Sequence, residues 1–118
     1  MEFGDRYPLL IGGERLDGAD GTSPIINPAT EATVGDVPEA SVDQAMAATA
    51  AAAEAFESWS RTEPEERAAL LDAAADLIDR HVDDLVPLAQ AETGATLTIT
   101  KTVQVPNAAT RLRRYAQG

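Results

Sequence analysis

The sequence predicts an α/β fold, with an N-terminal β-hairpin and short strands followed by three or four helices. Two observations support this prediction. Residues 1–40 contain short apolar runs separated by Gly, Asp and Pro, which is typical of strands and turns. From Ser41 onward apolar residues recur at helical spacing, so residues 41–118 are expected to be mainly helical. A chain of 118 residues is long enough for one small domain.

The first expected element is the hairpin. The apolar run of residues 9–11 and the stretch Glu14-Arg15-Leu16 flank Gly12-Gly13, a pair that can adopt the positive φ angles of a tight turn. Residues 17–21 are expected to form a loop.

Two further strands are expected before the first helix. Residues 24–26 form a short apolar run that Asn27-Pro28 ends, because proline has no amide hydrogen to continue a ladder. Residues 33–37 are a second candidate strand, which Pro38 closes.

The first long helix has a clear start. Ser41 and Gln44 form a capping-box pattern, in which each side chain satisfies a backbone amide near the other. Trp59 is expected to pack as an apolar anchor where the chain turns into the next helix. One stripe of this helix carries the apolar residues Val42, Ala45, Met46, Ala53, Phe56 and Trp59, together with Thr49.

The second helix is expected to begin in the same way. Thr62 and Glu65 repeat the capping pattern, and Pro64 lies in the first turn, where its missing amide hydrogen costs nothing. The expected buried stripe is Leu70, Leu71, Ala74, Leu77, Ile78 and Val82, and the expected solvent side carries Glu66, Asp72, Asp76, Asp79 and Asp83.

A third, short helix should start at Asp83 or Asp84, because Pro87 is tolerated only in a first turn. Gly94 is expected to end it in the left-handed conformation. Pro106 is then expected to open a last helix, with Ala109, Leu112 and Tyr115 on one side.

Composition limits the functional classes. The formal net charge is −11 and Lys101 is the only lysine, so nucleic acid and anionic membranes are not expected as partners. The acidic surface fits a protein adapted to high salt, with an ordinary acidic cytosolic protein as the alternative. No apolar run is long enough for a membrane span and residues 1–7 lack the pattern of a secretory signal, so a cytoplasmic location is expected.

The candidate chemical groups are few. The absence of cysteine excludes disulfides, thiolate metal sites and a thiol nucleophile. His81, the single histidine, lies near a helix C-terminus, where capping explains it better than catalysis. Arg111, Arg113 and Arg114 beside Tyr115 could bind a phosphate, but the helix dipole and the acidic helices explain them better. We therefore assign no catalytic, cofactor-binding or metal-binding residue.

Several motifs carry a family resemblance that covers most of the chain. They are Ile26-Asn27-Pro28-Ala29-Thr30, Ala55-Phe56-Glu57-Ser58-Trp59-Ser60, Pro64-Glu65-Glu66-Arg67, Glu92-Thr93-Gly94 and Arg113-Arg114-Tyr115-Ala116. In order and spacing the sequence resembles the N-terminal segment of the NAD(P)-dependent aldehyde dehydrogenase family, whose members are several times as long.

The resemblance implies a chemistry that this chain does not itself carry. Members of the family bind NAD or NADP on a Rossmann-like domain, and a cysteine thiolate attacks the aldehyde before a glutamate-activated water releases the acid. The catalytic Cys and Glu and the cofactor-binding glycines lie beyond the position that matches Gly118. Residues 1–118 are therefore expected to be an incomplete N-terminal part of the cofactor domain, with no cofactor bound by this chain alone.

Two departures from the family pattern are visible. Ala95-Thr96 follows Gly94, where many members have Lys-Pro. Some members of the family bind a monovalent cation with a backbone carbonyl, at the position that matches Ile26, and with an acidic side chain. The position of that acidic side chain matches Gln104 in this sequence, and the amide of Gln104 carries no negative charge. The site is therefore not expected here. The resemblance also favours helix or loop over strand for the β-branched residues 96–105.

The sequence thus predicts an aldehyde dehydrogenase N-terminal fragment that is inactive alone. Its apolar stripes would lack a partner, which predicts marginal stability or self-association. The expected partners are the remainder of the enzyme or a second copy. A stand-alone acidic helical interaction module or a split-enzyme subunit is the alternative.

Overall fold

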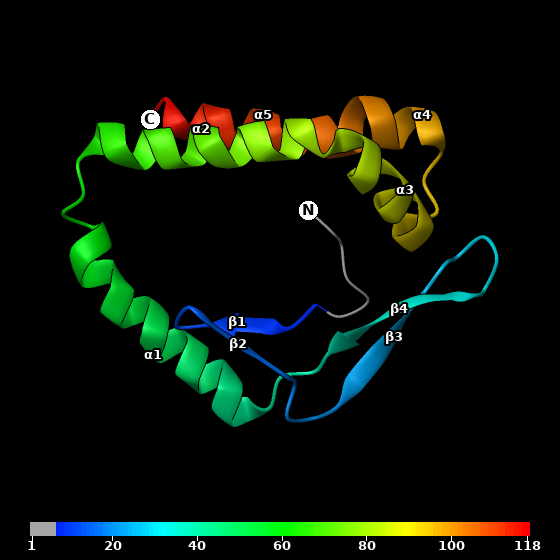
Figure 1. Ribbon diagram of the computed structural model, residues 1–118, viewed down its shortest axis with the longest axis horizontal. Coiled ribbons are helices and arrows are strands. Elements are labelled where there is room, and N and C mark those ends of the chain that lie inside the picture. The colour runs from blue at the N-terminus through cyan, green and yellow to red at the C-terminus, as the bar shows by residue number, and fades with distance from the viewer. Residues whose placement is uncertain (1–6) are drawn as a thin grey trace. The chain divides into compact units, whose positions relative to one another are not determined.

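The computed structural model describes residues 7–118, which form two compact units. The first unit comprises the described residues up to Ile26 together with Glu31–Arg61. The second comprises Asn27–Thr30 and Thr62–Gly118. Strands and one long helix make up the first unit, and helices make up most of the second (Figure 1). Among the described residues, the strands precede residue 41 and the helices follow it.

The predicted hairpin is confirmed. Strands β1 (Leu9–Ile11) and β2 (Glu14–Leu16) pair antiparallel, and Ile11 lies opposite Glu14 across the turn. Gly12 and Gly13 have φ angles of 59° and 87°, which glycine adopts without steric cost.

The two further strands pair with each other. Strands β3 (Thr22–Ile26) and β4 (Thr33–Pro38) are antiparallel, with an irregularity in register between Ile25 and Ile26. Strand β3 begins two residues earlier than expected, and Pro38 forms the end of β4 rather than following it. Each strand is short, so neither pair covers a large area.

Helix α1 (Val42–Trp59) begins with the predicted capping box. The Gln44 amide nitrogen donates to Ser41 Oγ at 3.2 Å, and the Ser41 amide nitrogen donates to Gln44 Oε1 at 3.1 Å. The same Gln44 side chain accepts from the Ala19 amide at 2.9 Å and donates from Nε2 to the Asp17 carbonyl at 2.8 Å. One glutamine therefore both caps α1 and holds the 17–21 loop against it.

The apolar stripe of α1 is exposed, which corrects the expected packing of Trp59. Trp59 is 43% exposed, and no residue of α1 is buried. The side of α1 near the hairpin presents Ala51 instead, because a Cβ built on Gly12 would lie 3.7 Å from the Ala51 Cβ. Small residues let the hairpin backbone approach the helix, and three-residue strands are too short to cover the large side chains.

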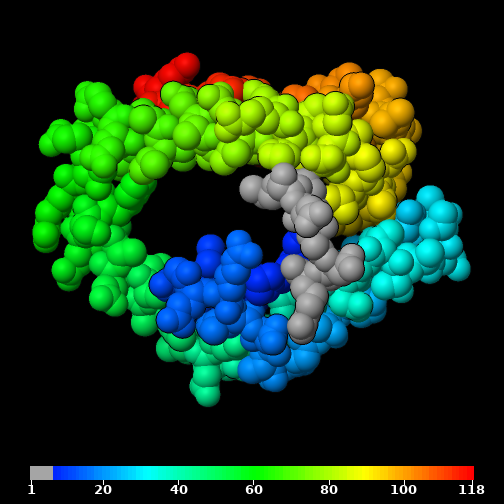
Figure 2. All heavy atoms as spheres, viewed as in Figure 1, coloured from blue at the N-terminus to red at the C-terminus, as the bar shows by residue number. Residues whose placement is uncertain are grey.

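The core of the second unit lies between helices. Helices α2 (Pro64–Arg80) and α5 (Val105–Ala116) run side by side (Figures 1 and 2). The buried residues of this unit are mostly small: Ala75, Val86, Thr100, Val105 and Ala109. Small side chains allow helices to approach closely, and their burial removes little apolar area from water.

The predicted faces of α2 and α5 need correction. Leu70 is 54% exposed and Leu77 is also exposed, whereas Ala75, outside the predicted stripe, is fully buried. On α5, Tyr115 is 73% exposed although Ala109 on the predicted side is buried. The reason is geometric. Each of these two helices has a wide apolar face, the neighbouring helix covers only part of that face, and the small residues lie where the two helices touch.

The start of α2 differs from the prediction. Pro64 is the first helical residue, as expected, but the N-cap is Glu63 and makes no side-chain capping bond. The capping box predicted at Thr62 and Glu65 is therefore wrong.

The start of helix α3 (Val82–Thr93) also differs. His81 precedes the first helical residue, so the predicted cap at Asp83 or Asp84 is wrong, and Pro87 lies inside the helix rather than in its first turn. The carbonyl of His81 accepts from the Asp84 and Leu85 amides at 3.1 and 2.9 Å, which starts the helix at once after α2. Gly94 ends it with φ 68°, as predicted.

Residues 97–116 form one helical run. Helix α4 (Leu97–Ile99) continues through a π-helical turn, η1 (Thr100–Gln104), into α5. The expectation of helix or loop rather than strand for residues 96–105 is confirmed. Pro106 lies in the first turn of the last helix, as expected, although the π-helical turn leads directly into that helix. The Val105 amide donates to the Thr100 carbonyl in the wider turn just before Pro106, which has no amide hydrogen to donate.

Candidate functional site

The single histidine has a structural role. His81 forms the junction of α2 and α3, and its Nδ1 lies 3.2 Å from Asp84 Oδ2. The ring of His81 thus lies beside a carboxylate of the first turn of α3. Within residues 7–118, no group of three or more His, Cys, Asp or Glu side chains is arranged to hold a metal ion.

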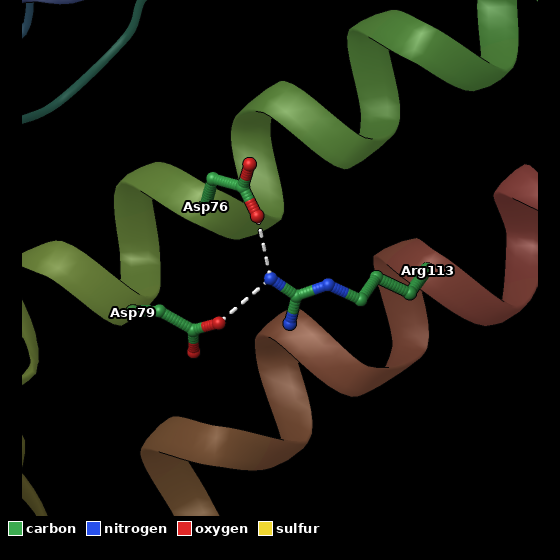
Figure 3. A network of polar contacts seen from close by, with 3 residues as sticks. All are labelled: Asp76, Asp79 and Arg113. Atoms are coloured by element: carbon green, nitrogen blue, oxygen red, sulfur yellow. Dashed lines mark hydrogen bonds and ion pairs between the residues drawn. The ribbon is translucent and has the colours of Figure 1, made fainter.

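One of the three arginines near the C-terminus joins two helices. Arg113 Nη2 on α5 donates to Asp76 Oδ1 and to Asp79 Oδ2 on α2, both at 2.7 Å (Figure 3). These hydrogen bonds, to Asp79 first and Asp76 second, raise the pKa of Arg113 above its ordinary value. The prediction that the arginines balance acidic helices is confirmed for Arg113, whereas Arg111 and Arg114 are exposed.

From the sequence, only the acidic side of this ion pair could be predicted. Asp76 and Asp79 are three residues apart and so lie on one side of α2, which was predicted to face solvent. Their partner is 34 to 37 residues away along the chain. Only the packing of α5 on α2 brings the cation to them.

Two motifs of the family resemblance meet in the second unit. A Cβ built on Gly94 would lie 2.6 Å from Pro28 Cγ, so the Asn27-Pro28 loop packs directly on the end of α3. Asn27 Oδ1 accepts from the Ala29 amide at 2.9 Å, which shapes the loop. Both motifs are therefore explained by their contact with each other.

A shallow hollow lies beside this contact. Its volume is about 260 Å³, and the loop and the end of α3 line it with Asn27, Ala29, Pro87, Gln90, Ala91, Gly94 and Ala95. None of these residues is a nucleophile or titrates near neutrality. The hollow can form hydrogen bonds, but it has no groups for acid–base or covalent chemistry.

The two residues of the disfavoured cation site lie in different units. Ile26 ends β3 in the first unit, and Gln104 ends η1 in the second, where it is exposed. The prediction that no cation binds at these residues rests on the missing negative charge at Gln104.

The comparisons with known proteins identify the family. The model of the aldehyde dehydrogenase family matches residues 16–118. The chain belongs to the aldehyde dehydrogenase family. It is 45% identical over 93 residues to 1-pyrroline-5-carboxylate dehydrogenase 2 of Bacillus subtilis, which covers 78% of this chain and 18% of that protein. It is 36% identical over 116 residues to an aldehyde dehydrogenase of Alternaria alternata, covering 97% of this chain and 23% of that protein.

The fold of this chain is also similar to solved structures of aldehyde dehydrogenases. An NAD-dependent benzaldehyde dehydrogenase from Corynebacterium glutamicum superposes with a TM-score of 0.85 at 29% identity, over 92% of this chain and 24% of that one. A betaine aldehyde dehydrogenase from Staphylococcus aureus, solved with NAD+, superposes with a TM-score of 0.87 at 31% identity, over 93% of this chain and 22% of that one. The α/β fold and the family predicted from sequence are confirmed.

The match is partial in length. This aldehyde dehydrogenase chain spans 23% and 18% of the two curated relatives named above. Among residues 7–118, no helix combines the length and the apolar character needed to cross a membrane.

Proposed function

We propose that this chain supplies the N-terminal part of the cofactor domain of an NAD(P)-dependent aldehyde dehydrogenase and catalyses no reaction by itself. The observation that carries the proposal is the family match over residues 16–118 in a sequence without cysteine. In this family the aldehyde is attacked by a cysteine thiolate, a group that this sequence does not contain.

The contacts of the motifs support a scaffold role. Pro28 and Gly94 pack on each other, and Arg113 joins α2 to α5. Each contact stabilises the second unit, and none leaves a reactive group free. The partner in this proposal is the remainder of the enzyme, which would cover the exposed apolar side chains of α1 and α2.

The direct test has two arms. In the first, the purified chain is mixed with NAD or NADP and a panel of aldehydes, and the expected result is no reduced cofactor. In the second, the chain is added to the Bacillus subtilis relative from which the matching segment has been deleted, with 1-pyrroline-5-carboxylate as substrate. We expect partial recovery of reduced cofactor.

Controls for this test come from the core of the second unit. The variant Ala75→Asp places a charge at a fully buried position between helices and should not restore activity. Turnover by the chain alone would contradict the proposal, because it would require a site outside the family chemistry.

The alternative function is a stand-alone acidic helical interaction module. Helices of both units expose apolar residues, and these residues support an interaction module as much as they support a segment that packs on the remainder of the enzyme. Co-purification distinguishes the two, since a module would bring down a protein unrelated to aldehyde dehydrogenases.

The proposal includes adaptation to a salt-rich cytoplasm. Every Asp and Glu among residues 7–118 is exposed, so the negative charge lies at the surface, where salt screens it. Helicity should therefore increase from low to molar salt, as measured by circular dichroism. A signal that is flat over this range would exclude the adaptation.

A further inference from the structure

We draw no further inference here: the strongest candidate, the shallow hollow between the Asn27-Pro28 loop and the end of α3, is lined, among the described residues, by amide, proline and small side chains that select no ligand, and nothing in the structure shows what covers it.

Discussion

Replacing Gly94 by alanine should strongly destabilise the second unit. Gly94 has φ 68°, which costs an L-amino acid with a Cβ about 1–2 kcal/mol. The new Cβ would also lie 2.6 Å from Pro28 Cγ, a distance that requires the loop or the helix end to move. Overpacking of this kind costs about 1–3 kcal/mol.

The backbone strain at residue 94 and the overlap with Pro28 both destabilise the Gly94→Ala chain. Together they amount to about 2–5 kcal/mol, well above the roughly 0.4–1 kcal/mol that alanine gains by restricting the unfolded chain. Small domains have total stabilities of about 5–15 kcal/mol, so the Gly94→Ala chain should unfold at a clearly lower urea concentration. Circular dichroism during urea titration measures the change.

A double-mutant cycle separates the two causes. Pro28→Ala removes the Cγ atom, and the remaining distance from the new Cβ to the Cβ of residue 28 is 3.6 Å, an ordinary contact. The cost of Gly94→Ala should therefore fall by about 1–3 kcal/mol in the Pro28→Ala background, leaving the backbone term. The same cost of Gly94→Ala in both backgrounds would refute the contact between the two motifs.

Three other changes test the remaining contacts. Arg113→Gln should lower the thermal midpoint of unfolding, and the decrease should be smaller in molar salt, whereas the control Arg114→Gln should leave the midpoint unchanged. Because the pKa of Arg113 is raised, the stabilisation by its ion pairs should stay constant from neutral to mildly alkaline pH. It should be lost only when strongly alkaline solution deprotonates Arg113. Gln44→Ala should cost more than Ser41→Ala, which removes only the cap and costs about 1 kcal/mol, and urea titration of both variants measures the difference. Thr100→Val should cost about 0.5–1.5 kcal/mol in the same titration, because it removes one hydrogen bond, to the Thr96 carbonyl, from a fully buried site without changing its shape.

The sequence alone determined the local features, because these depend on neighbouring residues. Gly12-Gly13 required a tight turn, Ser41 and Gln44 specified a helix start, and Gly94 specified a helix end. The motifs around Asn27-Pro28 and Gly94 also identified the family. Each signal is a property of a few consecutive residues, so it does not depend on the rest of the fold.

Tertiary structure decided which faces are covered. Periodicity placed Leu70 and Leu77 in a buried stripe, but the contact of α2 with α5 passes through Ala75. Similarly, the sequence assigned Asp76 to solvent, and packing supplied Arg113 as its partner. A stripe on a helix shows that a partner is needed, whereas the position and size of that partner depend on residues distant in the chain.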